Sequence, residues 1–178
     1  MASYYYLAAQ LPYLTYGQSV PMSSSAFREL AQKHLSSSDM AALEQCTLEP
    51  EFAGNAALSS FADKWKEWEG ALRLNLAKNR ARKLKREGIP AAPDFPFEAA
   101  SAAKAACAIE SPFEAEIFLD KARWDAIESF QGLDIFSEDA IYAYMLKLLL
   151  MERRMAFNAE EGYTEYKALY AAILGDQK

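Results

Sequence analysis

The chain has 178 residues, 52% of them hydrophobic and 13% aromatic, and its formal net charge is −6. This length allows one domain, or two small helical lobes that share a core, and the pI near 4.9 argues against a general nucleic-acid binder. Alanine, leucine and glutamate dominate, glycine is scarce, and Val20 is the only valine. That composition predicts an all-α fold.

The N-terminal part of the chain is expected to hold short elements. Residues 3–16 suit a short helix or an extended segment ended by Pro12, and the tyrosines at 4–6 are expected in the core with their hydroxyls at the surface. A second helix is predicted to begin near Ser25. The serines at 36–38 are expected to stop that helix and to cap the next one.

One long helix is predicted from about Ala57 to Arg86, about 45 Å long if unbroken. Two apolar stripes lie on nearly opposite sides of it. The first stripe consists of Phe61, Trp65, Trp68, Leu72 and Leu76, and the second of Leu74, Ala77, Ala81 and Leu84. The buried face is therefore expected to change sides midway, so that the helix bridges two helical lobes or projects its second half toward a partner. Its tryptophans, and Trp124 further along, are expected to be core residues rather than a ligand stack.

The clearest internal break is the segment 88–97, where Gly88 suits the end of a helix and three prolines follow. We predict a single all-helical domain, 1–178, arranged as a multi-helix bundle. Its candidate lobes are residues 1–88 and 97–178, which the break and the long helix join.

The sequence after the break predicts four further helices. Ser111 and Glu114 form a capping box at the start of one of them, and Ser137 is expected to cap the next. The ranges expected for the four helices are 98–109, 112–131, 138–158 and 163–174.

A weak internal echo relates the long helix to a later one. Residues 72–88 and 146–162 align without gaps. They share leucine at 72, 74 and 76 with 146, 148 and 150, arginine at 80 with 154, glutamate at 87 with 161, and glycine at 88 with 162. The echo is compatible with an internal repeat of two related helical lobes and leaves a duplication open.

No motif for a known catalytic chemistry occurs in the chain. HExxH, paired CxxC, an Asp-rich calcium loop, GxxxxGK[ST] and GxGxxG are all absent. The only histidine, His34, is expected near a helix end, as a favourable charge or a surface residue. Carboxylates two residues apart on a helix point in different directions and do not converge on one site. Two such pairs are Glu67 with Glu69 and Glu114 with Glu116, and both are expected to be solvated. We therefore predict no enzyme, no metal, no cofactor and no small-molecule substrate.

The chain is expected to be cytoplasmic. Cys46 and Cys107 lie far apart, which favours two reduced thiols over a disulfide. The apolar start has no basic region and is not predicted to be a signal peptide. The longest apolar run, 140–151, would rise about 18 Å as a helix, well short of the roughly 30 Å of a bilayer core, so it is predicted to be a buried helix with no direct membrane insertion.

The segment from Arg73 to Glu87 holds seven lysines and arginines and one acid. Three interpretations are open: a solvated helix end that complements the helix dipole, a docking surface for an acidic partner, and a nucleic-acid site. The third is disfavoured, because no aromatic residue between Leu74 and Glu87 can stack on a base and the acidic remainder of the chain would repel a duplex.

Four segments carry a resemblance to a known family: SYYYLAAQLPYL, FADKWKEWEGALRLNLAKNRARKL, SPFEAEIFLDKARWDAIE and AYMLKLLLMERRMAFN. In this order they resemble an uncharacterised bacterial family whose genes lie among those for V-type (A/V-type) ATPase subunits. The final helices are also distantly similar to the repeated helical modules of the C/d-type subunit of rotary ATPases, the socket between the membrane ring and the central stalk.

The resemblance implies a non-catalytic accessory or central-stalk (C/d-like) component of a bacterial V-type ATPase. Such a protein would be cytoplasmic, or peripheral to the inner membrane through the complex, and would act through contacts with V-type ATPase subunits. The residues expected to contact a partner are Arg73, Arg80, Arg82, Lys83 and Arg86. The alternative function is a helical nucleic-acid-associated protein that binds through residues 73–86.

Overall fold

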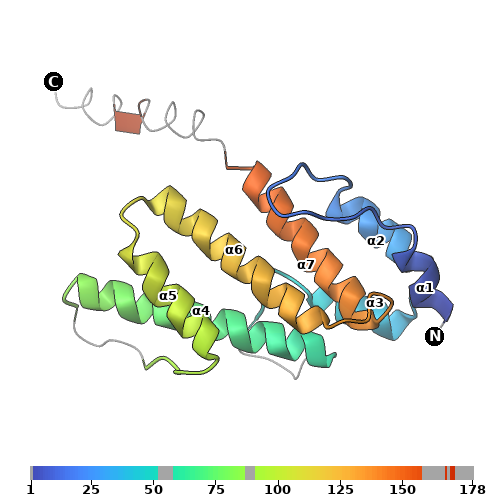
Figure 1. Ribbon diagram of the computed structural model, residues 1–178, viewed down its shortest axis with the longest axis horizontal. Helices are drawn as coiled ribbons and strands as arrows, with labels where there is room; N and C mark the ends of the chain where they lie inside the picture. The colour runs from blue at the N-terminus through green and yellow to red at the C-terminus, as the bar shows by residue number, and fades with distance from the viewer. Residues whose placement is uncertain (1, 52–57, 87–90, 158–166, 168, 171–178) are drawn as a thin grey trace.

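The computed structural model describes residues 2–51, 58–86, 91–157, 167, 169 and 170. Within these residues the chain forms helices and no strand, which confirms the predicted all-α fold (Figure 1). The helices are α1 (Ala2–Ala8), α2 (Ser24–Gln32), α3 (Ser37–Gln45), α4 (Ser60–Lys83), α5 (Phe97–Ala108), α6 (Pro112–Gln131) and α7 (Glu138–Met155). The predicted helix over 163–174 lies outside the described residues except for 167, 169 and 170, which are helical.

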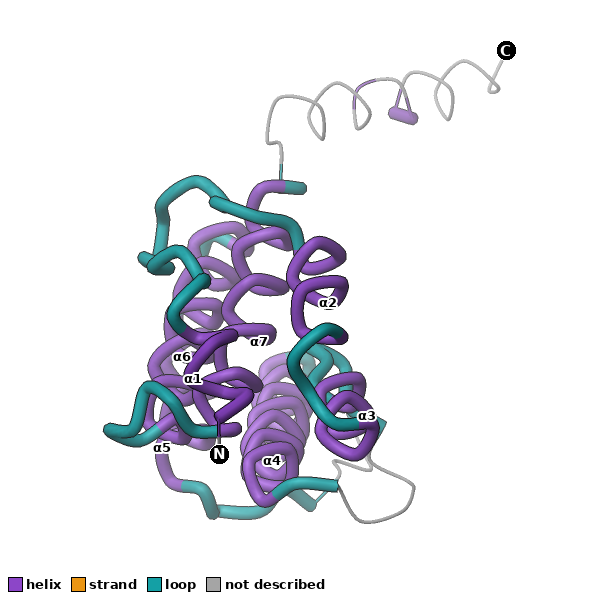
Figure 2. Tube along the Cα trace, turned by 90° about the vertical axis from the view of Figure 1, so that its right-hand side faces the viewer, coloured by secondary structure: helices purple, strands orange, loops and turns teal. Residues whose placement is uncertain are grey.

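Two helices organise the bundle. The long helix α4 contacts α5, α6 and α7, while α1, α2 and α3 pack on α7. Figures 1 and 2 show α6 and α7 running side by side, with α4 crossing beneath them. One continuous cluster of buried side chains extends from Leu7 in α1 to Met151 in α7. That cluster includes side chains from both sides of the segment 88–97.

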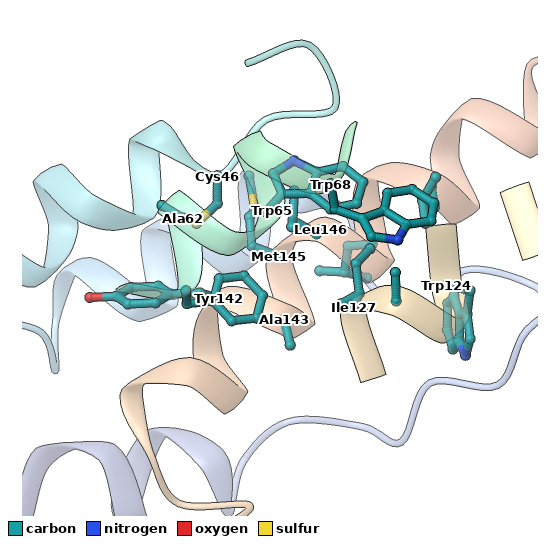
Figure 3. Close-up of a cluster of buried hydrophobic side chains, with 14 of the residues drawn as sticks. Cys46, Ala62, Trp65, Trp68, Trp124, Ile127, Tyr142, Ala143, Met145 and Leu146 are labelled. Carbon is teal, nitrogen blue, oxygen red and sulfur yellow. The ribbon is translucent and has the colours of Figure 1, made fainter. Parts of the chain in front are cut away.

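The tryptophans lie in the core, as predicted. Trp65 is fully buried and its ring stacks on that of Trp68, with centroids 6.0 Å apart (Figure 3). The Trp65 indole Nε1 donates a hydrogen bond of 2.8 Å to the Thr47 carbonyl, so the polar end of the ring is also satisfied. Trp124 is buried on α6, where the Lys147 ammonium lies 5.2 Å from its ring centroid.

Serine caps set the helix starts, as the sequence indicates. The Oγ atoms of Ser36, Ser111 and Ser137 each accept a hydrogen bond from the backbone N–H three residues on, at the start of α3, α6 and α7. The cap of α2 is Ser23, so that helix begins at Ser24, one residue before the predicted start. Each such cap satisfies a backbone donor that the helix itself cannot.

The prediction for the N-terminal tyrosines is right for Tyr4 and wrong for its two neighbours. Tyr4 is partly buried and donates a hydrogen bond of 2.9 Å to Asp39 Oδ2. Tyr5 and Tyr6 are 54% and 62% exposed. A single short helix can bury only one face, and α1 turns Leu7 into the core, which leaves these two rings outside.

The prediction that the buried face of the long helix changes sides is wrong. Leu74 and Leu84, from the second stripe, are 42% and 63% exposed. The first stripe instead remains the packed face as far as Leu76, because α5, α6 and α7 pack on α4 and leave the second stripe uncovered. Beyond Leu76 the described part of α4 extends past the core with no buried residue. Its last two turns therefore present side chains to solvent and to the end of α5.

Helix α4 spans Ser60–Lys83, about three residues shorter at each end than the predicted range of Ala57 to Arg86, and Gly88 lies outside the described residues. Lys85 takes a φ of 52°, and the Arg86 N–H reaches back to the Ala81 carbonyl at 3.0 Å. This hydrogen bond is the one that closes helices whose final turn reverses into the left-handed region. A lysine there carries a steric cost that glycine avoids.

Replacing Lys85 by glycine is therefore expected to raise the free energy of unfolding by about 0.5–1 kcal/mol. Arg82→Gly removes the same charge inside the last turn of α4 and is expected to lower it by a similar amount. Urea unfolding followed by circular dichroism measures both. Equal destabilisation by the two variants would contradict the left-handed conformation of Lys85.

Candidate partner-binding surface

The end of α4 carries a cluster of exposed cations. Arg80, Arg82 and Lys83 belong to its last turn, and Lys85 and Arg86 follow the C-cap residue Leu84. All five are exposed, and none forms an ion pair with another residue that the structure describes. We call these five residues the basic cluster. The helix dipole favours cations at this end, which accounts for their tolerance there without requiring a partner.

Arg73 is also predicted to contact a partner, but it lies outside the basic cluster. It is half-buried, its Nε lies 2.8 Å from Glu69 Oε1, and its Nη2 donates to the Leu48 carbonyl at 2.9 Å. The structure therefore brings Arg80, Arg82, Lys83 and Arg86 together and separates Arg73 from them. Arg73 instead holds the segment after α3 against α4.

A buried ionic network, which was not predicted from the sequence, lies next to Arg73. Glu69 is fully buried, and its carboxylate accepts two hydrogen bonds from Arg123, at 3.0 and 3.1 Å. Arg123 also contacts Asp120, which in turn pairs with Arg153 of α7. The network ties α4, α6 and α7 together through Glu69, Asp120 and Arg123, which are buried, and Arg153, which is partly exposed.

The prediction that Glu69 is solvated is therefore wrong. Glu69 follows Trp65 by four residues and so lies on the first apolar stripe, which the core covers. Its neighbour Glu67 is exposed, as predicted. A carboxylate on a tryptophan stripe, with an arginine beside Trp124 on another helix, is the sequence signal that would have found the pair.

A groove lies beside the basic cluster, between the second half of α4 and the connection from α5 to α6. The three segments come together at one end of the bundle in Figure 1. The groove has a volume of about 230 Å³, and its polar lining residues are Arg80, Lys83, Cys107 and Glu110. Its remaining lining is aliphatic. Two of the cations predicted to bind a partner thus border a hollow that the sequence alone does not reveal.

The two cysteines are both free thiols, as predicted, and lie in contrasting environments. Cys46 is buried, and its Sγ contacts the Ala42 carbonyl at 3.5 Å. Burial, with a smaller contribution from Asp139, raises the pKa of Cys46 from 9.0 to about 12. Cys107 is half-buried in the groove. Electrophilic thiol reagents are therefore expected to react with Cys107 before Cys46.

The raised pKa of Cys46 predicts a loss of stability in alkali. The unfolded thiol loses its proton near pH 9 and the folded thiol near pH 12, so the folded state binds the extra proton between these values. The contribution is fully present below pH 9 and is lost as pH rises, at about 1.4 kcal/mol per pH unit. Urea unfolding at pH 8 to 10.5 should show this slope, and a Cys46→Ala variant should show a shallower one. Identical slopes for the two proteins would contradict the raised pKa of Cys46.

The described residues contain no group of three or more His, Cys, Asp or Glu side chains that could hold a metal ion. His34 follows the end of α2, as predicted, and its Nε2 lies 3.3 Å from Gln10 Nε2. None of the described helices combines the length and apolar composition that crossing a bilayer requires.

Comparison of the chain with protein-family models, with curated proteins and with solved structures finds no match. The fold and the surface by themselves define an all-helical protein with a strongly basic helix end beside a largely aliphatic groove.

Proposed function

We propose that this protein is a non-catalytic adaptor that acts through protein–protein contacts, as an accessory or central-stalk component of a bacterial V-type ATPase. The observation that carries the proposal is the basic cluster. Arg80, Arg82, Lys83, Lys85 and Arg86 project from the end of a rigid helix of an acidic protein, with no ion-pair partner among the described residues. Grouped charges of one sign steer association with a surface of the opposite sign.

The link to the ATPase comes from the resemblance of the long helix and the later helices to the bacterial family whose genes lie among ATPase subunits. An adaptor needs a rigid framework and an exposed contact surface but no active site. The shared core of α4, α6 and α7 supplies such a framework, because it fixes the helix that carries the basic cluster.

Affinity purification of the tagged protein from its native host, at about 50 and 500 mM salt, tests the proposal. We expect V-type ATPase subunits at low salt and their loss at high salt, because salt screens exposed charges. The variant with Arg80, Lys83 and Arg86 changed to Glu should recover none. A matched variant with the exposed Lys33, Lys64 and Lys104 changed to Glu has the same net charge and should recover the subunits. A purification without any ATPase subunit would contradict the proposal.

The alternative function, nucleic-acid association through residues 73–86, makes a different prediction. Binding to a nucleic acid would weaken steeply as salt rises from about 50 mM, because condensed counterions are released on binding. Arg73 of this segment is engaged with Glu69 and Leu48 inside the fold. Absence of binding to single- and double-stranded probes at about 50 mM salt would exclude this function.

A further inference from the structure

The groove beside the basic cluster combines an apolar floor with a cationic border. Its aliphatic lining comes from three segments that are distant in the sequence: Leu76 of α4, Ala106 of α5, and Ile109, Pro112, Ala115 and Leu119 at the connection to α6 and within it. Leu76, Ala106 and Leu119 are buried, so the floor is part of the packed core and keeps its shape. Arg80 and Lys83 stand one helical turn apart along one side.

The size of the groove limits what it can hold. Its volume of about 230 Å³ is below the roughly 300 Å³ at which pockets for whole small molecules begin. A hollow of this size accommodates one or two aliphatic side chains. The groove therefore suits an anchoring residue of a longer chain better than a cofactor or metabolite.

The charges around the groove determine which chain would fit. Arg80 and Lys83 line it, and Arg82 and Arg86 are further exposed cations of the basic cluster outside its lining. Glu110 is the one acid among the lining residues. A nucleic acid would place phosphates against Glu110 and bases on a floor that has no aromatic ring to stack on. An acidic peptide with an aliphatic residue satisfies both the floor and the border.

We propose that this groove binds a short acidic segment of a partner protein, with a leucine-like side chain on the floor and glutamate or aspartate side chains against Arg80 and Lys83. The inference rests on the proposed function only in taking the protein to be an adaptor. It does not depend on the partner being part of an ATPase.

Cys107 supplies a built-in reporter for the groove. Its half-buried thiol lines the groove, whereas Cys46 is enclosed in the core. Iodoacetamide is small and uncharged, so its rate of reaction with Cys107 reports access to the groove rather than attraction to the cations. An occupant on the floor should slow this reaction.

The probe is a fluorescein-labelled synthetic peptide of alternating paired glutamates and single leucines, with a control peptide in which serine replaces each leucine. We expect the leucine peptide to bind the full-length protein with an affinity at least about tenfold higher than the serine peptide, measured by fluorescence anisotropy at about 100 mM salt. The leucine peptide should also slow alkylation of Cys107 several-fold. Equal binding of the two peptides, or unchanged alkylation, would overturn the proposal.

Two pairs of charge reversals separate the groove from the general positive surface. Arg80→Glu with Lys83→Glu changes groove residues, and Arg82→Glu with Arg86→Glu makes the same charge change outside the lining. The first pair should weaken peptide binding at least about tenfold and the second at most about threefold. Equal losses would mean that the peptide responds only to overall charge, which would overturn the groove assignment.

A third variant fills the groove without changing any charge. Ala115→Phe adds a ring over the aliphatic lining at a half-buried position. It should reduce binding of the leucine peptide to the level of the serine peptide, with circular dichroism verifying that the fold is retained. If this variant is unfolded, Ala115→Leu provides the same test with a smaller side chain. Undiminished binding by a folded variant would contradict the proposed floor.

An oligonucleotide tests whether the groove binds nucleic acid instead, and the ATPase purification separates the groove from the ATPase role. A single-stranded oligonucleotide that protects Cys107 as well as the leucine peptide does would overturn the peptide proposal in favour of nucleic acid.

Ala115→Phe is also used as bait in the native host. Peptide binding without recovery of ATPase subunits by the wild-type protein would support the groove and contradict the ATPase role. If Ala115→Phe recovers ATPase subunits as well as the wild-type protein does, the ATPase role is supported and the contact with the ATPase does not involve the groove.

Discussion

Replacing Glu69 by glutamine is expected to lower the free energy of unfolding by about 3 kcal/mol. The Glu69 carboxylate is fully buried and compensates the charge of Arg123, which is itself buried, and of half-buried Arg73. Removing the Glu69 charge breaks the shortest ion pair of Arg123 in a medium of low polarity, and leaves that guanidinium to the longer contacts with Asp120 and Glu116, at 3.3 and 3.7 Å. Glutamine has nearly the same size, so the loss would come from charge and not from a cavity. Urea unfolding at neutral pH measures the change.

The matched control for this variant is Glu67→Gln, two residues earlier on the same helix. Glu67 is exposed, so its replacement should change stability by no more than about 0.5 kcal/mol. Replacing Glu69 and Arg123 together by methionine should recover much of the loss, because two apolar side chains of similar length need no counterion. Equal effects of Glu67→Gln and Glu69→Gln would contradict the buried network.

Trp65→Ala is expected to be the most destabilising single core substitution, at about 3–5 kcal/mol. The Trp65 ring is fully buried, stacks on Trp68, and lies among side chains of α4 and α7 and near Cys46, which follows α3, in the cluster of Figure 3. Alanine would leave a cavity that rigid neighbouring helices can close only in part. Thermal and urea unfolding followed by circular dichroism measure the loss without relying on tryptophan emission.

Two comparison variants show which feature of Trp65 matters. Trp65→Phe keeps a ring but loses the hydrogen bond to the Thr47 carbonyl, so its cost should be smaller, about 1–3 kcal/mol. Leu84→Ala removes an exposed side chain from the end of the same helix and should change stability by less than about 0.5 kcal/mol. A large loss of stability for Leu84→Ala would contradict the exposed position of Leu84 and support a second buried stripe.

Much of the helical framework follows from local chemistry. Ser36, Ser111 and Ser137 cap helices where the sequence places them, because a cap depends only on a side-chain oxygen and a nearby backbone N–H. The first stripe of α4 is buried as its spacing predicts, because a helix carries residues three and four apart on one face. The exposed cations at the end of α4 were likewise expected from their order in the chain.

Spacing did not suffice where burial depends on residues far away in the chain. The second stripe of α4 has the apolar spacing of a buried face, yet no described helix covers Leu74 or Leu84. Glu69 lies on the first apolar stripe, but a buried carboxylate also needs a counterion, and Arg123 is brought against it from another helix. Whether an apolar stripe is covered, or a charge is compensated, depends on which helices the fold brings next to it.

The chain thus encodes its helices, their caps and the position of its basic cluster through interactions within a few residues. The tertiary packing decides that Glu69 is buried and Glu67 is not, and that Arg73 joins the interior while Arg80 and Lys83 border a groove. The groove exists only because Leu76, Ala106 and Leu119, from three helices, pack together. The physical reason is that desolvation and ion pairing depend on neighbours in space, whereas helix formation and capping depend mainly on neighbours in sequence.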